Sequence, residues 1–213
     1  MLRVLSFVNL IIAVQATFLS FHFLAKKKTE RSLNILVAIL CLIFSIITFN
    51  TYLNLNGYFS LLFQDIANNC MWFIGPSLYL FTIYHDGKAS VNSMLLHTLP
   101  YLLPALIGVT IKQDWVETYI PVLGFSQMCA YLFLTMSHCI KNYNRAKQFY
   151  NWILPTMITF SFLVIINVVL NILKRMSLHL LSDNVLQSFT SVLVIPIFFI
   201  AYREMNSSGD FGL

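Results

Sequence analysis

The sequence predicts an all-α integral membrane protein, built as a bundle of seven transmembrane helices. Composition is the first observation behind this prediction: of 213 residues, 58% are hydrophobic and only 10% are charged. Such a chain has too few polar side chains to cover a water-soluble globule. The second observation is that the apolar residues gather in runs of about 20, the length of helix that crosses the hydrocarbon core of a bilayer.

Seven apolar runs follow one another, and each is predicted to be one helix because backbone groups in a bilayer must pair within their own segment. The runs cover residues 4–24, 33–54, 62–84, 93–111, 119–140, 152–173 and 185–202. The first run leads into Ala25-Lys26-Lys27-Lys28 without a small-x-small cleavage site, which indicates a helix and not a signal peptide. We therefore predict a seven-helix domain over residues 1–203 and a short polar cytoplasmic tail over residues 204–213.

Polar segments and aromatic residues set the boundaries of the successive helices. AKKKTERS follows the first run, NLNGYFS the second, HDGKAS the third, KQDWVE the fourth, KNYNRAKQFYN the fifth and KRMSLHLLSDN the sixth. Aromatic rings prefer the surfaces of a membrane. Those that fall at the predicted boundaries are Trp115, Tyr119, Tyr143, Tyr150 and Trp152.

The distribution of Lys and Arg predicts the orientation, because cytoplasmic loops are enriched in both. The odd-numbered loops and the tail hold Lys26, Lys27, Lys28, Arg31, Lys88, Lys141, Arg145, Lys147 and Arg203. The opposite side holds Arg3, Lys112, Lys174 and Arg175. We expect a multi-pass protein of a bacterial plasma (inner) membrane, with the N-terminus outside and the C-terminus in the cytoplasm. The net charge of +5 follows from this topology and does not indicate a nucleic-acid partner.

Amide side chains inside the predicted spans form the candidate ligand-binding site. They gather in the outer half of the bundle and comprise Asn50, Asn54, Asn68, Asn69, Gln127, Asn167 and Asn171, with Asn9 and Gln187 at similar depth. An amide in hydrocarbon is costly unless it faces another helix or a wet cavity. Two interpretations stay open: an outward-facing pocket for a neutral or zwitterionic ligand, and hydrogen bonds between helices worth about 0.6–2 kcal/mol each.

Histidines and cysteines do not form a metal or cofactor motif. His22, His85, His97 and His138 lie toward the predicted cytoplasmic side, yet no two share a helix at a spacing of three or four residues. We interpret them as interfacial residues, with haem or metal ligation as the alternative. The four cysteines have no CxxC spacing and are predicted to be free thiols. No metal or cofactor is expected.

The absence of certain residue types and motifs from the sequence argues against several classes of membrane protein. The seventh run holds no Lys for a retinal Schiff base, which argues against a rhodopsin-type photoreceptor. Asp65 is the one acidic residue inside a predicted span, which argues against a proton-coupled or sodium-coupled transporter. No HExxH, GxSxG or phosphate-binding glycine motif is present. We expect that the protein is not an enzyme.

Two short stretches carry a family resemblance. GPSLYLFTIY at 75–84 and LLHTLPYLL at 95–103, joined by a polar loop, resemble the N-terminal membrane module of membrane-anchored AraC-type transcriptional regulators. In that family the third helix of a multi-helix bundle carries Gly-Pro-x-x-Tyr, and His-x-x-Pro opens the fourth. A cytoplasmic helix-turn-helix domain follows the last helix there, whereas this sequence contains no DNA-reading segment.

The resemblance implies that Gly75, Pro76, Tyr79, His97 and Pro100 are architectural residues. Proline inside a helix bends it and leaves a carbonyl free, which a neighbouring helix in a membrane can satisfy. These positions are therefore expected to shape the bundle and not to form a catalytic site.

Two function classes follow from the sequence. The first is a sensor or receptor-like module, in which a ligand among the amides changes helix packing and a cytoplasmic protein partner reads the change. The second is an accessory or stabilising subunit of a larger membrane complex, or a small-solute carrier. The expected partners are the lipid bilayer and a protein at the cytoplasmic loops or within the membrane.

Overall fold

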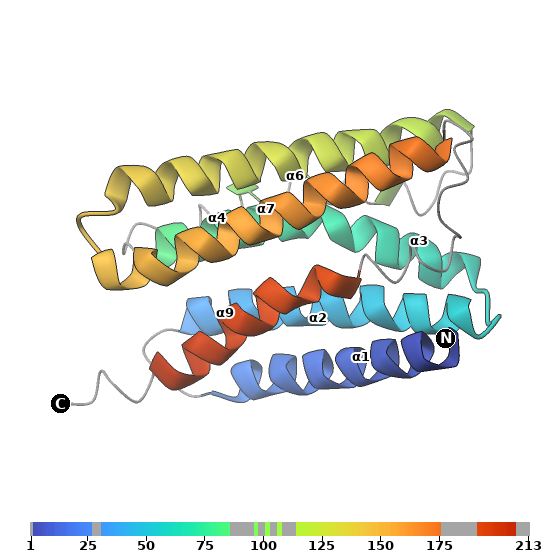
Figure 1. Ribbon diagram of the computed structural model, residues 1–213, viewed down its shortest axis with the longest axis horizontal. Helices are drawn as coiled ribbons and strands as arrows, with labels where there is room; N and C mark the ends of the chain where they lie inside the picture. The colour runs from blue at the N-terminus through green and yellow to red at the C-terminus, as the bar shows by residue number, and fades with distance from the viewer. Residues whose placement is uncertain are drawn as a thin grey trace.

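A computed structural model of the protein describes residues 2–26, 31–85, 96–97, 101–102, 106–107, 114–175 and 191–207, and the regular structure in these ranges is entirely helical (Figure 1). The elements are α1 (Leu2–Ala25), α2 (Arg31–Leu55), α3 (Leu61–Cys70), the 3₁₀ turn η1 (Met71–Phe73), α4 (Ile74–His85), α6 (Asp114–Asn142), α7 (Lys147–Arg175) and α9 (Val194–Ser207). The all-helical part of the fold prediction is therefore confirmed for the described residues.

Within the described ranges, three helices are long and apolar enough to cross a membrane. They are the segments Arg3–Ala25 of α1, Arg31–Leu55 of α2 and Lys147–Leu170 of α7. These segments lie at three of the predicted spans, 4–24, 33–54 and 152–173. Apolar helices of this length indicate a membrane protein.

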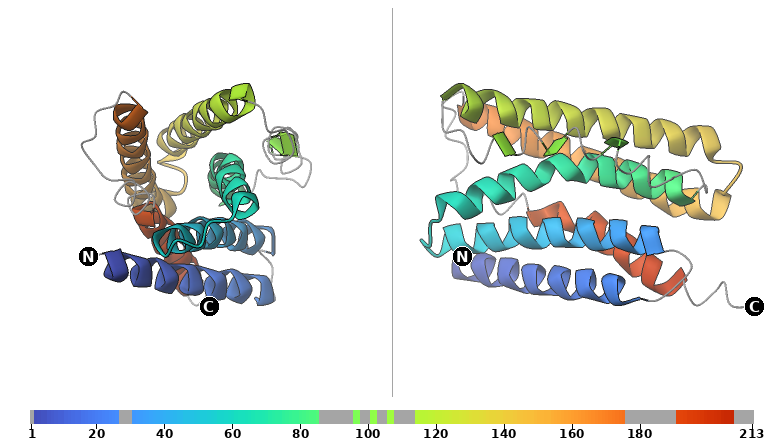
Figure 2. Two further views of the ribbon diagram at one scale, coloured as in Figure 1. Left: turned by 90° about the vertical axis from the view of Figure 1, so that its right-hand side faces the viewer. Right: turned by 180° about the vertical axis from the view of Figure 1, so that it is seen from behind.

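The other predicted spans correspond to shorter or partly described segments. The run at 62–84 forms α3, η1 and α4, which make one bent rod when seen from behind (Figure 2). The run at 119–140 lies within the longer helix α6. Of the run at 93–111 only three residue pairs are described, so Pro100 lies outside the described residues. α9 covers the second half of the run at 185–202 and continues to Ser207, past the predicted start of the tail.

α2 is the central helix of the bundle. It packs against α1, α3, α4 and α9, while α6 packs against α4 and α7. In the most apolar 18-residue stretch of α2, 67% of the residues are buried, against 28% in the corresponding stretch of α1. Phe7, Phe18 and Phe21 on α1 point outward, as side chains of a lipid-facing helix do. The core lies between α2, α4, α6, α7 and α9, where Phe44 meets Phe160 edge to face.

The helix ends gather at two opposite ends of the bundle (Figure 1). One end, called the basic end below, holds the end of α1, the start of α2, the end of α4, the α6–α7 turn and the end of α9. The elements at this end carry Lys26, Arg31, Lys141, Arg145, Lys147 and Arg203. The opposite end holds the start of α1, the α2–α3 turn and the end of α7. Charge is thus unevenly divided between the two ends.

Candidate functional site

The bend between α3 and α4 is stabilised by a side chain from α6. Pro76 has no N–H, so the carbonyl of Trp72, four residues earlier, lacks its intrahelical donor. The Nε2 group of Gln127 on α6 donates a hydrogen bond to this carbonyl oxygen at 3.1 Å. The predicted ligand residue Gln127 therefore contacts a neighbouring helix. Its Oε1 atom is buried and has no hydrogen-bond partner within the described ranges.

Two glycines bring the bent rod close to α6. A Cβ at Gly75 would lie 2.9 Å from Tyr131 Cβ and 3.3 Å from Met128 Cα, closer than packed atoms allow. On α6, a Cβ at Gly124 would lie 3.2 Å from the indole of Trp72, which is buried there. Glycine is required at position 75 because the backbones of α4 and α6 approach closely.

Tyr131 on α6 is the centre of an aromatic and histidine cluster. Its hydroxyl lies 2.9 Å from His97 Nδ1, and Tyr101 donates a hydrogen bond to it at 3.4 Å. The ring of Tyr79 on α4 lies 5.8 Å from that of Tyr131 and 5.4 Å from that of His97, centroid to centroid. Tyr79, His97 and Gly75 therefore lie around one residue, Tyr131, and their architectural role stays a prediction.

Sequence reasoning missed Tyr131, although a signal for it exists. Tyr131, Thr135, His138 and Asn142 follow one another at intervals of three or four residues, which places them on one face of α6. Tyr131, Thr135 and Asn142 are buried. A polar stripe of helical period inside an apolar segment indicates the face that meets other helices.

The remaining amides are spread over α2, α3 and α7. Asn50 and Asn54 are half-buried on α2, and Asn68 is exposed on α3. Asn69 donates to the carbonyl of Asp65 in its own helix at 2.8 Å. Asn171 belongs to α7, but its side chain lies outside the described part of the chain, and so does Gln187.

Two other amides join helices. Asn9 accepts a hydrogen bond from Ser191, which links α1 to the turn before α9, and Asn56 donates to Ser6 of α1 at 2.5 Å. Each of these contacts involves a different pair of elements. The ligand role of the amide set stays a prediction.

Asn167 lies at a small central cavity. The cavity lies among α2, η1, α4, α6, α7 and the turn before α9 and is lined by Phe44, Ile47, Met71, Ile74, Phe125, Met128, Phe160, Val164, Asn167 and Leu193. The volume of the cavity is about 10 Å³, which leaves room for one water molecule at most. The wall is apolar apart from Asn167, which is itself buried.

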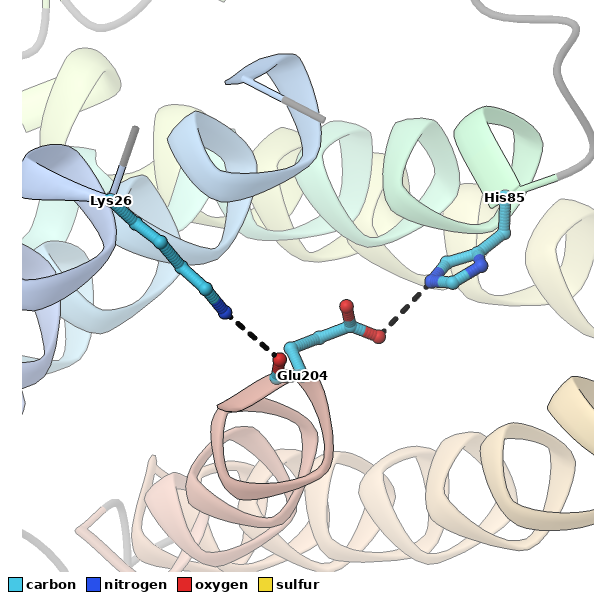
Figure 3. Close-up of polar contacts among 3 residues, drawn as sticks. All are labelled: Lys26, His85 and Glu204. Atoms are coloured by element: carbon cyan, nitrogen blue, oxygen red, sulfur yellow. Dashed lines mark hydrogen bonds and ion pairs between the residues drawn. The ribbon is translucent and has the colours of Figure 1, made fainter. Parts of the chain in front are cut away.

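A second polar cluster lies at the basic end (Figure 3). Glu204 on α9 is 5% exposed, and its Oε1 accepts a hydrogen bond from His85 Nε2 on α4 at 3.0 Å. Lys26, just after α1, donates to the main-chain oxygen of Glu204 at 3.2 Å. Sequence reasoning had assigned residue 204 to the polar tail, and no local pattern distinguishes its carboxylate from an exposed one.

Of the other histidines, His138 directly precedes Cys139 on α6, and its ring lies 6.4 Å from that of Tyr79, centroid to centroid. His22 is exposed, and His138 accepts a hydrogen bond through its main-chain oxygen from Asn142 at 2.9 Å. Among the described residues, no three His, Cys, Asp or Glu side chains are placed to hold a metal ion. Cys41, Cys70, Cys129 and Cys139, all within the described ranges, form no disulfide with one another, and Cys41 and Cys139 are buried.

No protein-family model, curated protein or solved structure matches this chain.

Proposed function

We propose that this chain is a membrane-embedded sensor or receptor-like module with seven transmembrane helices. α1, α2 and α7 supply three spans. The α3–η1–α4 rod, the segment at 93–111, α6 and the segment ending in α9 supply the other four. The proposal places the basic end in the cytoplasm of a bacterial plasma membrane, because Lys and Arg favour that side. The gathering of six cationic residues at one end supports this orientation.

The central cavity at Asn167 is the observation that carries the sensor proposal. Four α-helices, the 3₁₀ turn η1 and the turn before α9 contribute to its wall, so any molecule larger than water enters only if these elements move apart. Binding there changes helix packing, which is what a sensor requires. An apolar wall with one amide favours a neutral ligand, since a charged group would be buried without a partner.

A cytoplasmic protein at the basic end is the proposed reader of the change. Short cationic segments present Lys and Arg to such a partner, and acidic surfaces complement them. The resemblance of residues 75–103 to the membrane module of AraC-type regulators implies the same kind of role and stays part of the proposal.

The hydrogen bonds between helices favour a second candidate, an accessory or stabilising subunit of a membrane complex. Gln127 with Trp72, Asn9 with Ser191, and Asn56 with Ser6 all use amides to join elements. In this case the amides stabilise helix packing and the cavity is a packing defect.

Native mass spectrometry of the protein extracted in its own lipids tests the sensor proposal. A small molecule should remain bound to the wild type, be lost from Asn167→Leu, and remain on Asn144→Leu, whose position is exposed in the α6–α7 turn. A stoichiometric protein partner with no small molecule in any of the three samples would favour the accessory subunit.

A further inference from the structure

Polar contacts hold α9 at both of its ends. Ser191, just before α9, donates to Asn9 near the start of α1. About three and a half helical turns further along, Glu204 contacts His85 and Lys26. The two attachment points thus lie toward opposite ends of the bundle.

Between these contacts α9 is held by side-chain packing and by the contacts of Phe199 and Arg203 with Trp152 of α7. Ile197, Ile200 and Ala201 are buried against the bundle, whereas Ile195 and Phe199 face outward. In a bilayer, lipid tails solvate apolar side chains about as well as a protein core does, so no hydrophobic force drives helices together. Polar contacts then contribute a large share of the preference for the docked position.

Among the polar groups of α9, the carboxylate of Glu204 depends most on its contacts with the bundle. A carboxylate that is 5% exposed is stable only when hydrogen-bonded or paired. His85 supplies one side-chain contact to this carboxylate, at 3.0 Å. Lys26 contacts the main-chain oxygen in the last turns of α9, where a cation also complements the helix dipole.

His85 is held in the orientation that this contact requires. Its ring stacks on Phe149 of α7 with centroids 3.9 Å apart and planes 22° from parallel. Phe81, one turn earlier on α4, meets the same ring edge-on at 5.3 Å. Both ring contacts come from α4 and α7, so these helices orient the imidazole toward Glu204.

We propose that Glu204 and His85 form a latch, and that α9 is the helix that moves when the protein signals. Leu193 lines the central cavity at one end of the α9 segment, and Glu204 makes the latch at the other. The link from cavity to latch rests on the proposed sensor function. Displacement of Leu193 shifts α9 as a rod and withdraws Glu204 from His85, which frees the end of α9 for a cytoplasmic partner.

Hydrogen–deuterium exchange on the full chain in phosphatidylcholine/phosphatidylglycerol nanodiscs tests the latch. Glu204→Ala should speed amide exchange across residues 194–207 by about tenfold or more and leave residues 31–55 of α2 within about twofold of wild type. Tyr202→Ala, an exposed neighbour on the same helix, should leave both regions unchanged. Equal acceleration in α2 and α9, or none in α9, would overturn the latch.

A second pair of variants keeps the test decisive. Glu204→Gln preserves size and an acceptor for His85, so it should remain folded and show a smaller acceleration confined to α9. Leu193→Trp overfills the cavity and should accelerate exchange at residues 200–207. If Glu204→Gln unlatches α9 but Leu193→Trp does not, the coupling to the cavity is wrong while the latch holds. The mass-spectrometric result on bound ligand decides the sensor function separately.

Discussion

Gln127 donates its hydrogen bond to the one carbonyl that Pro76 deprives of a helical donor, that of Trp72. The proline and the glutamine lie on different helices, and the distance of 3.1 Å is that of an ordinary hydrogen bond. The bend in the α3–α4 rod is therefore compensated by α6. Stability and shape of this part of the bundle depend on the pair.

Replacing Gln127 by Leu should lower the free energy of unfolding by about 1 kcal/mol, because the Trp72 carbonyl loses its donor. Leaving a buried polar group without a partner usually costs about 1–3 kcal/mol. The lower value is expected here because the substitution also removes the buried, unpartnered Oε1 atom. Equilibrium unfolding in detergent measures the change. Leu at the exposed position Cys129 should be neutral.

The same substitution should cost less in a Pro76→Ala background. Alanine in place of the proline restores an N–H that can donate to the Trp72 carbonyl, so Gln127 becomes redundant there. A double-mutant cycle measures this coupling. Additive losses would show that the glutamine stabilises the bundle by some other contact.

Gly75→Ala should destabilise the protein by about 1–3 kcal/mol, the usual cost of overpacking. The new Cβ meets Tyr131 Cβ at 2.9 Å and the Met128 backbone at 3.3 Å, and neither can move without shifting a helix. Gly124→Ala should cost less, because its new Cβ meets only the indole of Trp72. Thermal unfolding of both variants in one detergent gives the ranking, and a reversed order would contradict the close approach of α4 and α6.

Tyr131→Phe should lower the free energy of unfolding by about 0.5–1.5 kcal/mol, because the hydrogen bond to His97 is lost. In a His97→Phe background the same change should cost less, because only the longer hydrogen bond from Tyr101 is then lost. Tyr202→Phe, at an exposed position, serves as the control. Chemical denaturation of the wild type, the two single variants, the double variant and this control measures the difference. An equal loss in both backgrounds would show that Tyr131 is not coupled to His97.

Single cysteines at two turns test the orientation. Tyr58→Cys in the α2–α3 turn should react with a membrane-impermeant maleimide added to intact cells. Arg145→Cys in the α6–α7 turn should react only after the cells are permeabilised. The unsubstituted protein gives the background, since Cys129 is exposed. Labelling of position 145 from outside would reverse the proposed topology.

The sequence predicts the long helices well because each depends on a local property. The runs at 4–24, 33–54 and 152–173 are continuously apolar, and they lie within α1, α2 and α7. The division of the run at 62–84 is harder to foresee. Gly75 and Pro76 indicate a bend, but they do not predict the 3₁₀ turn at Met71–Phe73 that precedes them. The donor to the Trp72 carbonyl in this turn comes from α6, far away in sequence.

The site was less predictable, since it depends on contacts between distant segments. Amide residues alone do not show whether they face a cavity or a helix, and only Asn167 of the described candidates lines the cavity. Glu204 has no distinguishing neighbour in sequence, and His85 reaches it from 119 residues away. Tyr131, by contrast, is predictable from the sequence, because it belongs to the polar stripe on α6.

The contact between Asn9 and Ser191 joins residues 182 positions apart, which has a consequence for biogenesis. α1 and α2 are neighbours in the chain and can pair as soon as both have entered the membrane. The place that α9 later takes stays empty until residues 191–207 have been synthesised, so α1, α2 and α7 keep that face turned to lipid until then. Assembly of this bundle is therefore completed by a late, long-range event, and the interval before it is when chaperones and membrane proteases have access.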